Sequence, residues 1–122
     1  MGALQGVHSR TVARIDPQRG TVQRQSVLGA TSISAGAGGI WVADNDRSIW
    51  RVDGSRPQRI GVGAQPQDVA ATSDGVWVAD FGDQTAVRVD PTSRRVVART
   101  KLGHQPVAVA TGGGVVGVAV AQ

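Results

Sequence analysis

Apolar and polar positions along the chain alternate in short runs that are typical of β-strands. Between residues 66 and 102, a run of small residues is followed by a nearly continuous apolar run, an alternating run and a longer polar run. These runs are residues 68–72, 76–80, 85–90 and 95–102. Ser, Asp, Gly and Pro separate them, and these residue types favour tight turns. The pattern predicts four strands joined by short reversals.

The same pattern recurs along the chain at a nearly constant spacing. Arg-aliphatic-Asp triplets begin at Arg14, Arg51 and Arg88, each 37 residues after the last. The run Trp-Val-Ala-Asp begins at Trp41 and again at Trp77, 36 residues later. Self-similarity with a period of about 20–50 residues indicates a repeat architecture, in which neighbouring units bury each other's apolar faces.

The order of strands within one repeat predicts a blade of a β-propeller. The small residues of the first strand suit the crowded axis, and the polar fourth strand suits the outer rim. We therefore expect an all-β chain with one fragment of a propeller. It would begin with the C-terminal half of a blade at residues 11–28, continue with two whole blades at residues 31–62 and 66–102, and end with the N-terminal half of a blade at residues 106–120.

The two predicted half-blades lead to an expectation about assembly. A propeller typically needs about 4–8 blades, and this chain has about three blades' worth of strands. One half-blade supplies a first and a second strand, and the other supplies a third and a fourth. Two copies could therefore close a six-bladed ring as a homodimer, exchanging strands and covering the open strand edges.

The blade motifs are specific to one architecture. They are Pro66-Gln67-Asp68-Val69-Ala70, Gly75-Val76-Trp77-Val78-Ala79-Asp80, Val87-Arg88-Val89-Asp90-Pro91 and residues 97–103. These motifs resemble the repeats of bacterial YVTN and NHL propellers, including streptogramin-lyase-like proteins, and the resemblance covers nearly the whole chain. It implies a propeller fold but no single activity, because that fold hosts many functions. The last repeat departs from the pattern, with Val116-Gly117-Val118-Ala119-Val120 in place of the Trp-Val-Ala-Asp run.

Composition narrows the classes of function. The chain has no cysteine, which excludes disulfides and a cysteine nucleophile. Its net charge of +4 comes from Arg residues dispersed through the repeats, and few aromatic residues are available to stack on bases, so we expect no nucleic-acid partner. No apolar run approaches the roughly 20 residues that span a bilayer, and residues 1–10 lack the pattern of a signal peptide. We expect no membrane partner, and the compartment stays open.

The polar loops on one predicted face of the propeller hold the candidate ligand-binding residues. That face receives the loops from second to third strands and from fourth strands to the next first strands. The candidates are Asp44, Asp46, Asp80, Asp83, Asp68, His104 and Gln105. Carboxylates and an imidazole around a channel mouth could hold a divalent metal ion or a cationic or sugar-like small molecule. Alternatively, the Asp side chains only accept hydrogen bonds from loop N–H groups.

Two other patterns predict structural contacts. Residues two apart on a strand share one face, so the Arg-x-Asp pairs, such as Arg51 and Asp53, predict ion pairs between neighbouring blades. Trp41 and Trp77 lie in the second strands and are expected in the core. Trp50 is expected to fill a gap between blades or, alternatively, to offer a stacking platform for a sugar.

We expect a non-enzymatic scaffold or binding module that assembles with itself, with no catalytic residue and no cofactor. One alternative is a lyase-like or metal-dependent enzyme that uses His104 and the aspartates of the same predicted loop face. The streptogramin lyases, by the resemblance, use histidine and glutamate with magnesium, whereas this chain has no glutamate and only His8 and His104. That acid–base pair is therefore not available in its usual form. The other alternative is a sensor or interaction module cut from a larger envelope protein.

Overall fold

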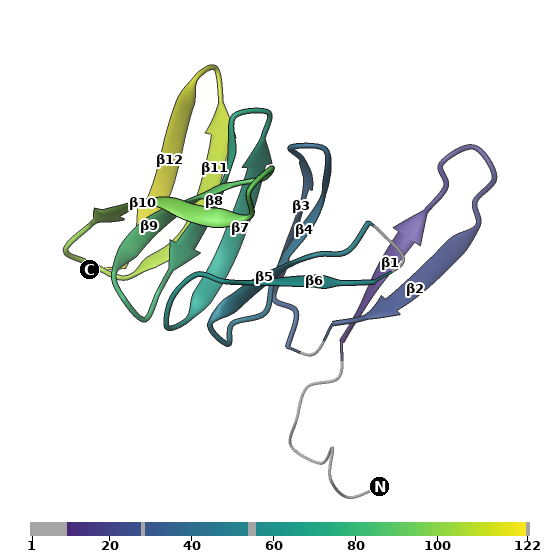
Figure 1. Cartoon of the computed structure of the whole chain (residues 1–122), viewed down its shortest axis with the longest axis horizontal. Coiled ribbons are helices and arrows are strands. Elements are labelled where there is room, and N and C mark those ends of the chain that lie inside the picture. The colour runs from purple at the N-terminus through teal and green to yellow at the C-terminus, as the bar shows by residue number, and fades with distance from the viewer. Residues whose placement is uncertain (1–9, 28, 54–55, 122) are drawn as a thin grey trace, which may run out of the picture.

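The fold consists of four antiparallel β-sheets arranged in a row (Figure 1). The computed structural model describes residues 10–27, 29–53 and 56–121, and His8 and the predicted strand residue Leu28 lie outside these ranges. The all-β prediction is confirmed for the described residues, which form no helix able to cross a membrane. The strands are β1 (Thr11–Ile15), β2 (Val22–Ser26), β3 (Ser32–Gly36), β4 (Gly39–Ala43), β5 (Ser48–Arg51), β6 (Gln58–Gly61), β7 (Pro66–Thr72), β8 (Gly75–Asp80), β9 (Thr85–Asp90), β10 (Arg95–Lys101), β11 (Pro106–Gly112) and β12 (Val115–Val120).

Two whole sheets stand between two smaller ones. Strands β3-β4-β5-β6 form one four-stranded sheet, and β7-β8-β9-β10 form the next in the same order. The pairs β1–β2 and β11–β12 each form a two-stranded sheet. In Figure 1 the β1–β2 sheet lies at one end of the row and the β11–β12 sheet at the other. This arrangement of short antiparallel sheets is that of partial propeller blades.

Tight two-residue turns join the first two strands of each repeat. Gly36 pairs with Gly39 across the β3–β4 turn, where Ala37 and Gly38 have φ angles of 51° and 74°. Gly113 and Gly114 occupy the β11–β12 turn with φ angles of 57° and 77°. Positive φ at both turn residues is the requirement of a type I′ hairpin, whose twist matches that of the flanking strands.

Apolar side chains fill the space between each pair of neighbouring sheets. The largest cluster joins the two whole sheets, with Trp41, Ile49 and Ile60 on one side and Val76, Val78 and Val89 on the other. A second cluster joins β1 and the residues after β2 to the first whole sheet. A third joins the second whole sheet to the β11–β12 sheet and includes Val109, Val116 and Trp77. The core is therefore a series of interfaces, as expected for stacked repeats.

Trp41 and Trp77 differ in burial although they occupy the same position in the repeat. Trp41 is fully buried between the whole sheets, which confirms its predicted core position. Trp77 is only half-buried, because the sheet beside it has two strands instead of four. Trp50 packs in the second cluster, between the β1–β2 sheet and its own sheet, as predicted.

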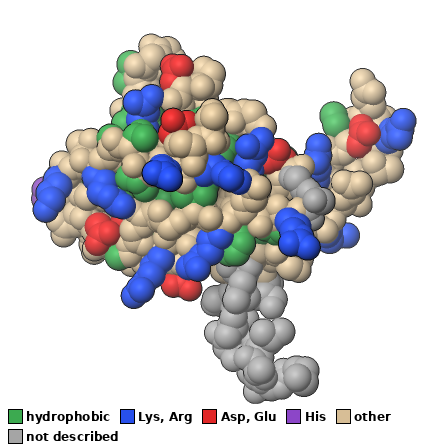
Figure 2. Space-filling model, in the orientation of Figure 1, with side chains coloured by type: hydrophobic (Ala, Val, Ile, Leu, Met, Phe, Trp, Pro, Cys, Tyr) green, Lys and Arg blue, Asp and Glu red, His purple; other side chains and the backbone are tan. Residues whose placement is uncertain are grey.

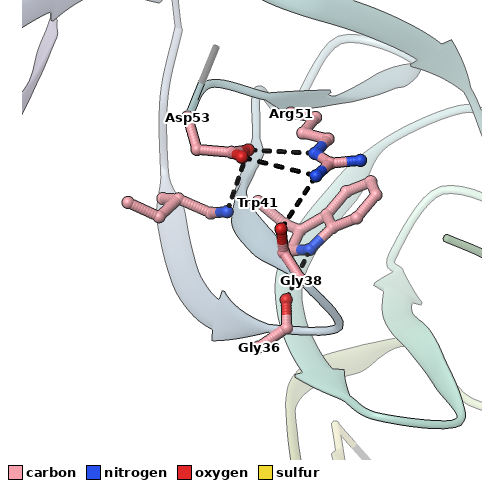
Figure 3. A network of polar contacts seen from close by, with 6 residues as sticks. Gly36, Gly38, Trp41, Arg51 and Asp53 are labelled. Atoms are coloured by element: carbon pink, nitrogen blue, oxygen red, sulfur yellow. Dashed lines mark hydrogen bonds and ion pairs between the residues drawn. The ribbon is translucent and has the colours of Figure 1, made fainter.

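The repeated Arg-x-Asp pairs do not link neighbouring blades, and that prediction was wrong. Arg51 Nε lies 3.0 Å from Asp53 Oδ1 in the same repeat, and this is the single salt bridge within the described ranges. Arg51 also donates to Gly38 O, at 2.8 Å, and its guanidinium carbon lies 5.6 Å from the centre of the Trp41 ring (Figure 3). Asp53 Oδ1 accepts a further bond from Ile40 N at 3.2 Å. The pair instead ties the end of β5 to β4 and to the β3–β4 turn of its own sheet.

Candidate functional site

The predicted site residues lie mainly in the loops at one end of the strands. Residues 44–47 join β4 to β5, and residues 81–84 join β8 to β9. Residues 62–65 and 102–105 lead into β7 and β11. In Figure 1 these loops lie along the lower side of the row, opposite the tight turns of the hairpins. The topology therefore brings the loops to one side of the molecule, as a propeller blade requires.

In the β4–β5 loop, Asp44 has a structural role. Its Oδ1 accepts hydrogen bonds from the backbone N–H groups of Asp46, at 2.7 Å, and Ser48, at 3.2 Å. Its Oδ2 accepts a bond from Trp50 Nε1 at 2.8 Å. Both oxygens of this buried carboxylate thus have donors, while the side chain of Asp46 is exposed. The geometry is that of an Asx turn, which stabilises the loop.

The β8–β9 loop is built differently, because it brings two carboxyl groups together. Asp80 is fully buried, and its Oδ1 accepts a bond from Gln65 N at 2.9 Å. Asp83 Oδ2 accepts a bond from Ala64 N at 3.0 Å. A side chain at Gly63 would place its Cβ 1.7 Å from Asp80 Oδ2 and 3.0 Å from Asp83 Oδ2. The two carboxyl groups therefore meet at the space that Gly63 leaves open.

The proximity of these groups pushes their pKa values apart. Burial raises the pKa of Asp80, and the nearby carboxyl group of Asp83 raises it further, against the opposing effect of the Gln65 N–H. The pKa of Asp83 is lowered, chiefly by the hydrogen bond from Ala64 N and then by its contact with Asp80. Two carboxylates this close titrate as a pair, and one holds its proton more strongly than an isolated Asp.

Thr85 adds a third oxygen near this pair. It opens β9, pairs with Asp80 across the β8–β9 ladder, and is 5% exposed. Cross-strand partners project to the same face of a sheet, so the side chain of Thr85 lies on the same face as that of Asp80. Both Asp80 Oδ2 and Thr85 Oγ1 are buried and have no hydrogen-bond partner among the described residues.

Asp68 lies apart from these loops, in the bulged start of β7, and connects three sheets. Its Oδ1 accepts bonds from the Ser32 hydroxyl in β3 and from Val69 N, the latter at 2.9 Å. Its Oδ2 accepts a bond from Val109 N in β11 at 2.8 Å. The carboxylate therefore joins the first strands of three successive sheets, and this structural task occupies both of its oxygens.

His104 and Gln105 lie in the connection before β11. His104 is exposed, and its imidazole has no hydrogen-bond partner in the part of the chain that the structure describes. Gln105 is half-buried, and its backbone carbonyl accepts a bond from Ala121 N at 2.8 Å. Within the described ranges, no three Asp or His side chains come close enough together to hold a metal ion by themselves. Only Asp80 and Asp83 of the seven predicted residues are seen to share one site.

Gly63 and Thr85 belong to this site and were not predicted from the sequence. A signal for Thr85 existed, since it stands where the other whole repeat has Ser48. Gly63 had none, because its importance comes from the carboxyl groups that occupy the space beside it.

Positive charge is dispersed on the visible face of the molecule (Figure 2). Lys and Arg side chains are spread over the face of the molecule seen in Figure 2. This distribution agrees with the expectation from the sequence that the excess of Arg is dispersed through the repeats.

Comparison with known proteins identifies the fold. No protein-family model matches the chain, and no curated protein matches it. Among solved structures it is similar to a streptogramin B lyase, with a TM-score of 0.73 and 16% identity over 90% of this chain and 41% of that one. It is also similar to Kuenenia stuttgartiensis hydrazine synthase, with a TM-score of 0.63 and 18% identity over 67% of this chain and 26% of that one. The chain thus spans less than half the length of either protein. At these identities the similarity shows a β-propeller-like fold and no activity.

Proposed function

We propose that the chain is a non-enzymatic β-propeller scaffold that closes a six-bladed ring with a second copy of itself, and that its loops bind a small ligand. The resemblance of its motifs to bacterial YVTN and NHL repeats supports the same architecture. The lyase activity in the name of the streptogramin B lyase is not carried over, because 16% identity supports the fold alone.

The observation that carries the proposal is the exposure of apolar residues on β1 and β12. Ile15 in β1 is 63% exposed, whereas Val52 and Val89, at the same position of the two whole repeats, are 6% and 0% exposed. Val115, at the start of β12, is 66% exposed. Strands that carry such residues at an unpaired edge are favourable templates for another chain.

The whole sheets supply the template for this pairing. Within the second whole sheet, β8 pairs with β9 through Val76–Val89 and Val78–Val87. Residue 116 corresponds to 76 and residue 15 to 89, so the same register would pair β12 of one copy with β1 of the other. Val116 would then face Ile15 of the second copy, and Val118 would face its Ala13. The result is a sheet in the order β11-β12-β1-β2, with two strands from each chain.

The surface beside Trp77 has room for this addition. A groove of about 490 Å³ lies between the second whole sheet and the β11–β12 sheet, and Trp77, Arg88, Val115 and Val116 line part of it. At the complete interface, Trp41 and Val89 share one apolar cluster. Ile15 of a second copy would take the corresponding position near Trp77.

The mass of the 122-residue chain in solution tests the proposal. We expect twice 12.5 kDa by light scattering at micromolar concentration. A well-folded species of 12.5 kDa would contradict it.

A designed disulfide tests the register. The chain has no cysteine, so Ala13→Cys with Val118→Cys introduces the only thiols. We expect oxidation to give a two-chain product with no longer species, because both junctions of a closed ring cross-link. The control pairs Val118→Cys with Arg24→Cys. Arg24 is the β2 partner of Ala13 and would lie one strand farther from β12, at about 10 Å, beyond the roughly 7 Å that a disulfide allows. A ladder of longer products would refute ring closure.

A further inference from the structure

We infer that the β8–β9 loop binds a hard divalent cation, Mg²⁺ or Ca²⁺, through the carboxyl groups of Asp80 and Asp83 and the hydroxyl of Thr85. This inference deepens the ligand-binding part of the proposed function, on which it rests, and it does not depend on ring closure.

The first observation is a pair of buried oxygens without donors. Three buried side-chain oxygens have no hydrogen-bond partner in the described ranges, namely Asn45 Oδ1, Asp80 Oδ2 and Thr85 Oγ1. Two of the three belong to one cross-strand pair, Asp80 and Thr85, whose residues are 0% and 5% exposed. A buried oxygen without a hydrogen-bond partner lowers the stability of the fold by roughly 1–3 kcal/mol. Folded proteins therefore normally supply a partner. A cation is a partner that both oxygens can share.

The first whole sheet shows how the same positions are satisfied without a cation. There Asp44 and Ser48 occupy the places of Asp80 and Thr85. Trp50 Nε1 donates to Asp44 Oδ2 at 2.8 Å, and Arg59 Nε donates to Ser48 Oγ at 2.6 Å.

Both of those donors are lost in the second whole sheet. Val87 stands in place of Trp50 and has no side-chain donor. Arg99, which pairs with Val87 as Arg59 pairs with Trp50, instead donates to Val62 O at 2.6 Å. Asp80 Oδ2 thus loses its donor by the substitution of Trp50 by Val87, and Thr85 Oγ1 loses its donor because Arg99 points to Val62 O instead.

The second observation is the position of Asp83. Its Oδ2 and Asp80 Oδ2 both lie within 3.0 Å of the point where a Cβ at Gly63 would stand. Two carboxylates held this close repel each other unless a positive charge or a shared proton lies between them. Neither makes a salt bridge of 4.0 Å or less with a described Lys or Arg. Arg99 is the nearby cation, and it lowers the pKa of Asp83 only through a longer-range charge interaction.

The ligand set selects the class of cation. Carboxylate and hydroxyl oxygens are hard ligands that suit Mg²⁺ and Ca²⁺, and the chain has no thiolate to favour softer metals. Two carboxylates with water completing the coordination are typical of Mg²⁺ sites and of weak Ca²⁺ sites. We therefore expect dissociation constants of roughly 10⁻⁴ to 10⁻³ M.

Titration calorimetry of the full chain with MgCl₂ and with CaCl₂ at pH 7.5 tests the inference. We expect one site per chain, and a melting temperature that rises by a few degrees in 10 mM of the metal that binds. Asp83→Asn and Thr85→Val should each raise the dissociation constant, Asp83→Asn by at least about tenfold. Asp46→Asn is the matched control, because it removes a carboxylate at the corresponding place in the other loop and should leave binding unchanged.

The location of binding has its own measurement. Substoichiometric Mn²⁺ should broaden the backbone amide signals of Ala64 and Gln65 before those of Asp46 and Ser48. The inference fails if neither metal gives binding heat or a shift in melting temperature, in which case the two carboxyl groups share a proton instead. It also fails if Asp83→Asn and Asp46→Asn weaken binding equally. Light scattering of the same samples with and without EDTA measures assembly, so failure of the ring and failure of the cation site are separate results.

Discussion

At the scale of single residues, identical triplets make different contacts because their surroundings differ. Asp53 accepts bonds from Arg51 and from Ile40 N. Asp16 and Asp90 instead cap turns, accepting bonds from Gln18 N at 2.9 Å and Thr92 N at 2.8 Å respectively. The sequence predicts that these positions are equivalent, but it does not show which N–H groups lie free beside each carboxylate. The equivalence of the three Asp positions was therefore predictable from the sequence, but the hydrogen-bond partner of each Asp was not.

The Arg51–Asp53 pair gives a prediction about pH. Burial raises the pKa of Asp53, but hydrogen bonds from Arg51 and the Ile40 N–H outweigh it, so the folded pKa lies below the usual 3.8. A lowered folded pKa adds stability above pH 3.8 that is lost as pH falls through the folded value. Asp53→Asn should therefore lower the free energy of unfolding at pH 7 by about 0.2–1 kcal/mol, as for a partly exposed pair. Urea unfolding at pH 7 and pH 3 should show a smaller difference at pH 3, because the contribution is lost as pH falls toward and through the folded pKa. Equal losses at both would refute the charge interaction.

At the scale of elements, close approach of the first strands fixes how neighbouring sheets meet. Ala71 N donates to Ser34 Oγ at 2.9 Å, which ties β7 to β3 by a side chain instead of a backbone ladder. The succession of small residues in these strands was predicted from the sequence. The particular contacts were not, since they depend on the distance between sheets that are 36 or more residues apart in the chain.

Gly36 tests this close approach. Its φ is +151°, and an added Cβ would lie 2.7 Å from Ala71 O. Gly36→Ala should therefore destabilise the chain by about 1–3 kcal/mol, through backbone strain and separation of β3 from β7. Gly61→Ala is the matched control, because Gly61 ends β6 with no atom within 4 Å of an added Cβ. Urea midpoints at one protein concentration compare the two. Equal midpoints would show that the inner strands tolerate more space than the structure indicates.

At the scale of the whole molecule, the row of sheets leaves apolar surface at both ends. The propeller-like fold and the four-stranded units were predictable, because repeats of a fixed period carry them. The half-buried state of Trp77 was not, because the burial of Trp77 depends on the sheet beside it and not on its own repeat.

A single substitution should separate assembly from folding. Ile15→Ser removes an exposed side chain, so we expect the single chain to fold as before. In a ring it would remove about 1.5–3 kcal/mol of apolar burial at each of two junctions, raising the dissociation constant at least about a hundredfold. Val97→Ser is the control, since Val97 is 53% exposed on β10, away from the proposed junction. Light scattering across a dilution series distinguishes the two variants. If the Ile15→Ser and Val97→Ser variants dissociate with the same constant, β1 is not part of the interface.

Contacts limited to adjacent sheets have a consequence for how such a molecule can diversify. Duplication of one repeat adds a unit together with both surfaces that it needs, so the framework is inherited whole. Within that framework a loop can exchange its chemistry without disturbing a distant unit. The second repeat illustrates this freedom: it keeps the Trp-Val-Ala-Asp run of the first, yet replaces Trp50 by Val87. Two equivalent loops of one chain thus differ in chemistry: the Asp44 carboxylate is fully hydrogen-bonded, whereas Asp80 keeps an unpaired buried oxygen.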